Sequence, residues 1–156
     1  MERRLFQTVI RILFICHGNI CRSPAAEMVL RTLMPDAQVD SAATTTEEIG
    51  NGVYPPMRRA LERRGIPVLP HTARLTNAGD YRNYDYIIGM DAENRRDLNW
   101  IYRGDPDHKV SLLMEWAGKS CEVSDPWYTR DFDKALDDIE VGCRAVVVTL
   151  RKRKAE

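Results

Sequence analysis

The stretch FICHGNICRSPAAEMVL, residues Phe14 to Leu30, joins an apolar strand signal to a helix signal through a short polar loop. The apolar run begins at Val9 and is rich in β-branched residues, as expected of a strand buried in a parallel sheet. Ser23 and Pro24 are typical of a helix N-cap and first turn, and Pro35 ends the helical pattern. The stretch therefore predicts a strand, a loop and a helix in immediate succession.

The rest of the chain repeats this alternation of strand and helix. Further strands are expected at residues 37–42, 84–90 and 108–116, and further helices at residues 55–65, 91–100 and 132–150. Gly65 is expected to end the first of these helices, and Asp91 to cap the second. Such alternation predicts an α/β fold with a four-stranded parallel sheet in the order 2-1-3-4 and helices on both faces, flavodoxin-like or Rossmann-like. Ligands bind beyond the carboxyl ends of such strands, and Cys16 lies at that edge.

Length and composition predict a cytoplasmic globular protein. Its 156 residues fit a single domain spanning residues 1–156, which can bury a core without disulfides or metals. Lys plus Arg and Asp plus Glu number 23 each, so no net field draws the protein to nucleic acid or to a membrane. No apolar segment is long enough to span a bilayer, and residues 1–11 lack a signal-peptide pattern. Four cysteines without paired spacing favour a reducing compartment over a disulfide framework.

The loop from Cys16 to Ser23 has the pattern C-x5-R-S, which is typical of an anion site. Backbone N–H groups in such an arc point inward, and the following helix N-terminus adds partial positive charge, which suits a phosphate. Gly18 and Asn19 tolerate the positive φ of a tight arc, and the planar guanidinium of Arg22 can hold two phosphoryl oxygens. The positive surroundings favour the thiolate of Cys16, with Ser23 as a further hydrogen-bond donor. The loop therefore predicts a nucleophilic thiolate beneath a bound phosphate.

This loop, taken together with DPWY at Asp125 to Tyr128, resembles the low-molecular-weight protein tyrosine phosphatases. The likeness extends over nearly the whole chain. Other segments similar to that family include DSAAT at 40–44, RRGIP at 63–67, HTAR at 71–74 and RDLN at 96–99. The resemblance implies hydrolysis of phosphotyrosine in proteins through a phosphocysteine intermediate, without a metal or other cofactor.

The resemblance also implies roles for individual residues. Cys16 is expected to be the nucleophile, Arg22 the clamp on the phosphate, and Asp125 the general acid and then the general base. Pro126 is expected to stiffen the loop that carries Asp125, and Trp127 and Tyr128 are expected to form a wall for the aromatic substrate. The remaining assignments are the phosphate-binding loop residues His17, Gly18, Asn19, Ile20, Cys21 and Ser23, the supporting residues Ser41 and His71, and the rim residue Glu47.

Two of these positions, Cys21 and Glu47, bear on regulation and on specificity. Cys21 is either a small packing residue or, as the resemblance implies, the partner that captures oxidised Cys16 in a reversible disulfide. Relatives often carry an aromatic residue where this chain has Glu47, so one wall is lost there and a negative charge is gained. A zinc site at Cys16, His17 and Cys21 would lack a fourth ligand, so no metal is expected.

Three rival functions use a similar loop. A thioredoxin-coupled arsenate reductase needs redox cysteines mid-chain, and this chain has none between Cys21 and Cys121. A protein arginine phosphatase carries threonine where this chain has Ile20, so phosphotyrosine is favoured. A non-catalytic phosphotyrosine-binding module is the third, but all three catalytic residue types are present. The expected partners are tyrosine-phosphorylated proteins or peptides, and the chain is expected to be a monomer or a weak homodimer.

Overall fold

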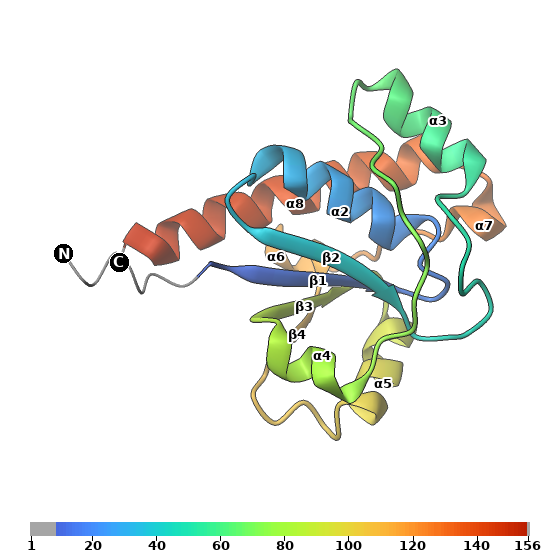
Figure 1. The fold of residues 1–156 in the computed structure, drawn as a ribbon. Coiled ribbons are helices and arrows are strands. Elements are labelled where there is room, and N and C mark those ends of the chain that lie inside the picture. Colours follow the sequence, from blue (N-terminus) through green and yellow to red (C-terminus); the bar gives the residue numbers. More distant parts are fainter. Residues whose placement is uncertain (1–8, 156) are drawn as a thin grey trace.

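The computed structural model describes residues 9–155, in which four parallel strands form one sheet (Figure 1). The strand order is β2-β1-β3-β4, which confirms the predicted α/β fold and topology. The strands are β1 (Arg11–Cys16), β2 (Gln38–Ala43), β3 (Tyr86–Gly89) and β4 (Val110–Leu112). β1 pairs with β2 along its whole length and with β3 on its other side, so it lies in the middle of the sheet.

Helices cover both faces of this sheet, as the alternation predicts. They are α2 (Arg22–Leu33), α3 (Pro55–Arg63), α4 (Ala78–Asn83), α5 (Ala92–Ile101), α6 (Leu113–Trp116), α7 (Pro126–Thr129) and α8 (Phe132–Ala155). In Figure 1, α2 and α8 lie above the sheet, and α4 and α5 lie below it. Helices α3 and α6 pack against α8. No helix among the described residues is long and apolar enough to cross a membrane.

The central strand β1 is buried on both faces, which explains its continuous apolar sequence. Successive side chains of a strand point to opposite faces of the sheet. Ile12 and Phe14 accordingly pack in the core with α2 and α8, whereas Leu13 and Ile15 pack in the second core with α4 and α5. All four side chains are fully buried, and burying each one stabilises the fold by about 1.5–3 kcal/mol. The strand that carries the loop is therefore firmly anchored.

The loop after β1 lies where the chain changes sides of the sheet. The connection from β1 to β2 runs through α2 on one face, and the connection from β3 to β4 runs through α5 on the other. Ligands of such sheets bind at this point, in the crevice outside the carboxyl ends of the strands. The fold therefore places the loop from Cys16 to Ser23 where a ligand is expected.

One predicted strand is shorter than expected. The apolar run at 108–116 is a strand only over β4, and its second half is the short helix α6. Leu113 of α6 is fully buried and fills the space beside Gly142 of α8, where an added Cβ atom would clash with it. Periodicity alone cannot assign a short apolar run to strand or helix. Packing against α8 decides the outcome here.

Candidate active site

Cys16 lies at the carboxyl end of β1 and is only 3% exposed. Its sulfur Sγ accepts hydrogen bonds from the backbone N–H groups of Asn19 (3.3 Å) and Ser23 (3.4 Å), and the Ser23 hydroxyl lies 3.0 Å away. The N-terminus of α2 adjoins the same loop. Two backbone N–H donors and the N-terminus of a helix thus surround the sulfur, so its immediate environment carries partial positive charge. This geometry suits Cys16 to act as a nucleophile.

The predicted N-cap role of Ser23 is wrong. α2 begins at Arg22, and Cys21 precedes it without a capping hydrogen bond from its side chain. Ser23 is fully buried, and its hydroxyl accepts a hydrogen bond from the Asn19 side-chain amide at 2.8 Å. Because that hydroxyl accepts from Asn19, its own proton can point at the sulfur of Cys16. The residue therefore serves the loop and not the helix end.

Asn19 holds the loop in shape. It is fully buried with a φ of 59°, a positive value that asparagine tolerates better than most residues. Its side-chain amide donates to the hydroxyls of Ser23 (2.8 Å) and Ser41 (2.9 Å), and its side-chain carbonyl accepts from the Arg74 backbone N–H (3.1 Å). The His71 ring donates from Nε2 to the Asn19 backbone carbonyl at 2.7 Å. One network thus brings these residues together, and their part in catalysis stays a prediction.

Gly18 does not take the positive φ that its residue type suggested. Within the loop only Asn19 does so. A Cβ atom at position 18 would instead lie 3.2 Å from Glu48 Cγ, tighter than an ordinary contact. A larger residue here would require the Glu48 side chain to shift by a few tenths of an ångström.

Glu27 is a supporting residue that the sequence did not reveal. The Ser41 hydroxyl accepts from Asn19 and donates to Glu27 Oε1 at 2.6 Å. Glu27 is 9% exposed, and its other oxygen pairs with Arg31 at 3.0 Å. A glutamate on a helix usually faces solvent, so nothing in the sequence distinguishes this one. The buried carboxylate fixes the direction of the Ser41 hydroxyl and thereby the Asn19 network.

Replacing Asn19 by alanine is expected to lower the free energy of unfolding by about 2–4 kcal/mol. The change removes a partner from the buried hydroxyls and from the Arg74 N–H, and it forces a positive φ on alanine. Urea unfolding measures the loss. Asn19→Gly is the matched control, because it removes the same hydrogen bonds but tolerates the positive φ, and it should recover about 1 kcal/mol. A loss below about 1 kcal/mol for alanine would contradict this role.

Arg22 is buried beside the loop and held by three acceptors. Its guanidinium donates through Nη1 to Asp91 (2.8 Å) and to the Val123 carbonyl (2.9 Å), and through Nη2 to Asp125 (3.4 Å). Burial works against its charge, but the attraction of Cys16, Asp125 and Asp91 outweighs burial and raises the pKa of Arg22. The guanidinium therefore carries a full positive charge next to the cavity.

Asp125 lies at the N-terminus of α7 and faces Arg22. Its Oδ1 accepts from the Trp127 backbone N–H at 3.0 Å, so the carboxylate caps this short helix. Pro126 occupies the first turn of α7 and is buried. The side chains of Trp127 and Tyr128 are 49% and 81% exposed and line the cavity. Helix α7 thus presents one carboxyl group and two aromatic rings to the site.

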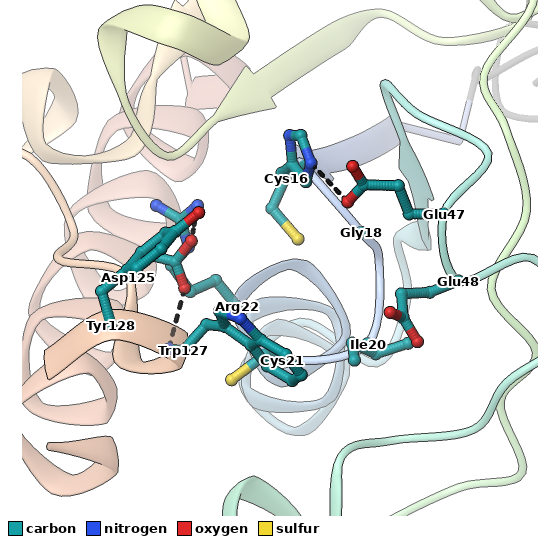
Figure 2. A pocket seen from close by; sticks show the side chains of 11 residues that line it. Cys16, Gly18, Ile20, Cys21, Arg22, Glu47, Glu48, Asp125, Trp127 and Tyr128 are labelled. Carbon is teal, nitrogen blue, oxygen red and sulfur yellow. Dashed lines mark hydrogen bonds and ion pairs between the residues drawn. The ribbon is translucent and has the colours of Figure 1, made fainter. Parts of the chain in front are cut away.

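The opposite rim of the cavity is acidic. His17 Nε2 lies 2.7 Å from Glu47 Oε2, and His17 Nδ1 lies 3.7 Å from Glu93 Oε1. Figure 2 shows Glu47 and Glu48 across the cavity from Asp125. Glu47, which contacts His17, and Glu48 thus bring two carboxyl groups to this side of the cavity.

The site residues surround one cavity of about 280 Å³ (Figure 2). The lining residues are Cys16, His17, Gly18, Ile20, Cys21, Arg22, Glu47, Glu48, Asp125, Trp127 and Tyr128. All the predicted site residues line the cavity except Asn19, Ser23, Ser41 and His71. These four do not line it and instead form the hydrogen-bond network behind the loop. Within residues 9–155, no group of three or more His, Cys, Asp or Glu side chains is arranged to hold a metal ion.

Cys21 lines the same cavity but has a different environment from Cys16. Burial raises the pKa of Cys21, and the nearby Cys16 raises it further. Cys21 therefore stays a neutral thiol, and its side chain belongs to the core that α2 and α8 share. Packing is thus one of its roles, and the capture of oxidised Cys16 stays a prediction.

Asp91 is a site residue that the sequence predicted only as a helix cap. It does cap α5, since its Oδ1 accepts from the Asn94 N–H at 2.9 Å, while its other oxygen binds Arg22. The sequence did contain a signal for this position. Asp91 closely follows the end of β3, and Cys16 ends the neighbouring strand β1, so the two residues lie at the same edge of the sheet. The rule that locates Cys16 at the ligand edge therefore locates Asp91 there as well.

The chain matches known proteins over most of its length. The family described as low molecular weight phosphotyrosine protein phosphatase matches residues 11–156. The low molecular weight protein-tyrosine-phosphatase YfkJ of Bacillus subtilis is 33% identical over 94% of this chain and 99% of that protein. The low molecular weight phosphotyrosine protein phosphatase of Homo sapiens is 40% identical over 81% of this chain and 85% of that protein. The crystal structure of YfkJ from Bacillus subtilis has a TM-score of 0.91 to this chain at 32% identity, covering 96% of this chain and 99% of that one.

Proposed function

Because the chain belongs to the low molecular weight phosphotyrosine protein phosphatase family, we propose that its Cys16, Arg22 and Asp125 hydrolyse phosphotyrosine in proteins through a phosphocysteine intermediate. Family membership makes the chain a protein-tyrosine-phosphatase, and the proposal assigns the chemistry to residues. One observation carries the assignment. The sulfur of Cys16 lines the cavity and accepts hydrogen bonds from the backbone N–H groups of Asn19 and Ser23.

In the first step, the Cys16 thiolate attacks the phosphorus in line, and the bond between phosphorus and the tyrosine oxygen breaks. Asp125 is protonated at this stage and gives its proton to the leaving phenolic oxygen. Arg22 and the loop N–H groups stabilise the charge that spreads over the equatorial phosphoryl oxygens. The dephosphorylated tyrosine leaves, and the phosphoryl group stays on the sulfur.

In the second step, water attacks the phosphocysteine. Asp125 is now a carboxylate and takes a proton from the water, and the phosphorus–sulfur bond breaks to return the Cys16 thiolate and inorganic phosphate. Arg22 Nη2 lies 3.4 Å from Asp125 Oδ2, so the proposed phosphate clamp and the proposed acid are in contact.

The lining of the cavity supports an aromatic leaving group. Trp127 and Tyr128 offer ring faces to a phenol. Ile20 also lines the cavity, and its branched apolar side chain gives the guanidinium of phosphoarginine no hydrogen-bond acceptor. A buried polar group without a partner is costly, so phosphoarginine is disfavoured at this wall.

Hydrolysis of matched phosphotyrosine, phosphoserine and phosphoarginine peptides tests the proposal. In reducing buffer with EDTA, kcat/KM for phosphotyrosine should exceed that for the other two by at least about hundredfold. Phosphate release gives the rates. Preference for phosphoarginine would overturn the inference from Ile20, and loss of activity with EDTA would show that a metal takes part. If none of the three peptides is hydrolysed, the proposal fails and the site is a binding site only.

A further inference from the structure

Asp125 has to keep its place in the cavity that it shares with Cys16 while its own charge changes. The ion pair with Arg22 needs a carboxylate, so it weakens in the protonated state that the first step uses. Helix α7 spans only four residues, and of these Pro126 alone is buried. A contact that does not depend on charge must therefore help to keep α7 in position.

Tyr54 supplies such a contact. Its ring centroid lies 5.2 Å from that of Trp127 on α7 and 5.8 Å from that of Phe132 at the start of α8. Arg130, which follows α7, places its guanidinium 5.7 Å from the Tyr54 ring centroid and donates to the Tyr54 hydroxyl at 3.3 Å. Contacts between rings, and between a ring and a guanidinium, do not depend on whether Asp125 holds a proton.

The backbone of Tyr54 is fixed to the loop that carries the nucleophile. Its N–H donates to the Ile20 carbonyl at 2.8 Å, and Ile20 lies between Cys16 and Arg22 in that loop. Pro55 follows and restricts Tyr54 to an extended backbone, as observed with φ −58° and ψ 127°. One residue thus contacts both the loop with the nucleophile and the helix with the acid.

We propose that Tyr54 is a positioning residue that holds Asp125 over the leaving oxygen. Tyr54 is not among the residues that line the cavity, so it acts through Trp127 and α7. The inference rests on the proposed function, because it requires Asp125 to be the general acid. Loss of the Tyr54 ring should impair protonation of the leaving group and spare attack by Cys16.

A series of aryl phosphates with phenols of different acidity separates these two effects. In Tyr54→Leu, kcat/KM for phosphotyrosine should fall by about tenfold, because its phenol needs a proton to leave. For an aryl phosphate with a strongly acidic phenol, kcat/KM should fall by less than about twofold, because such a phenol leaves without being protonated. Tyr54→Phe keeps the ring contact with Trp127 and should stay within about twofold of the parent on every substrate.

Tyr86→Leu is the matched control for loss of a tyrosine ring. Tyr86 forms a comparable cluster elsewhere, with its ring 5.5 Å from that of Trp116, the Arg153 guanidinium 5.7 Å from its centroid, and an Arg153 hydrogen bond to its hydroxyl at 3.2 Å. This variant should lose stability to a similar degree without changing how kcat/KM depends on the phenol.

Asp125→Asn distinguishes failure of this inference from failure of the proposed function. If Asp125→Asn leaves the dependence on the phenol unchanged, Asp125 is not the acid and both proposals fail. The other outcome is that Asp125→Asn makes kcat/KM depend more steeply on the acidity of the phenol. If Tyr54→Leu then lowers kcat/KM equally for all substrates, or for none, only the positioning role is overturned. In the double variant, loss of Tyr54 should add no further steepening, because no acid remains to be positioned.

Discussion

Replacing Cys16 by serine is expected to lower kcat/KM for a phosphotyrosine peptide by about 10⁵-fold or more. The N–H groups of Asn19 and Ser23 contact Cys16 Sγ, but in the variant they cannot ionise a serine hydroxyl, which is a far weaker acid than a thiol. Without a thiolate the first displacement has no nucleophile. Rapid-quench mass spectrometry should accordingly detect a phosphorylated Cys16 peptide in the parent protein and no phosphopeptide in the variant.

The fold should tolerate this substitution. The serine oxygen can accept from the same N–H groups, so the free energy of unfolding should change by less than about 1 kcal/mol. Calorimetry should show that the variant still binds a phosphotyrosine peptide. Cys121→Ser is the matched control, because Cys121 is an exposed cysteine that does not line the cavity, and its replacement should leave kcat/KM unchanged. Residual turnover above about 1% of the parent would show that another group attacks the phosphorus.

The long elements could be predicted from the sequence because their signals are local. The apolar run of β1, the proline that ends α2 and the glycine after α3 each act within a few residues. Gly65 takes a φ of 71°, a conformation that glycine adopts without strain, so its predicted place at the end of α3 is confirmed. Asp91 caps α5 as predicted, through a hydrogen bond from the Asn94 N–H. The strand order then follows because few topologies are compatible with such alternation.

The short helices α4 and α7 were not predicted, because the residues at their starts also suit a turn. Asn77 precedes α4, and its side chain and that of Asp80 cap each other's backbone, while Asp125 precedes α7 and Pro126 is its first residue. The sequence predicted only a proline-stiffened loop at Asp125. Asx residues and proline occur in turns as often as at helix starts, and helices of four to six residues gain little from intrinsic propensity. Tertiary contacts decide whether such a segment becomes helical.

The chemistry of the cavity loop could be predicted from the sequence, but only some of the residues that hold it could. Cys16 and Arg22 belong to one contiguous motif, so their types and spacing are visible in the sequence. Glu27, Asp91 and Tyr54 reach the site only through the packing of α2, β3 and the segment before α3. A local motif therefore indicates which atoms react, whereas the fold determines what holds them in place.

Replacing Arg22 by lysine is expected to lower kcat/KM by about 10³-fold. One guanidinium donates to Asp91, the Val123 carbonyl and Asp125, and it has further N–H groups for a phosphate. A single ammonium cannot satisfy these acceptors and grip two phosphoryl oxygens in one plane. The free energy of unfolding should also fall by about 1–3 kcal/mol, because the Val123 carbonyl or Asp91 loses its partner. Steady-state kinetics and urea unfolding measure the two losses separately.

Arg64→Lys is the control that distinguishes two roles of Arg22, binding of the phosphate and formation of a structural ion pair. Arg64 donates to Glu140 (2.6 Å) and Asp133 (3.2 Å) between α3 and α8, outside the cavity, so its replacement should lower stability and leave kcat/KM unchanged. If Arg22→Lys behaves in the same way, Arg22 is a structural ion pair and the loop N–H groups alone must hold the phosphate. A fall in kcat with little change in KM instead means that the guanidinium binds the equatorial oxygens more tightly as the leaving bond breaks. The transition state then requires the planar guanidinium. This requirement explains why the chain keeps the charged side chain of Arg22 buried beside the nucleophile.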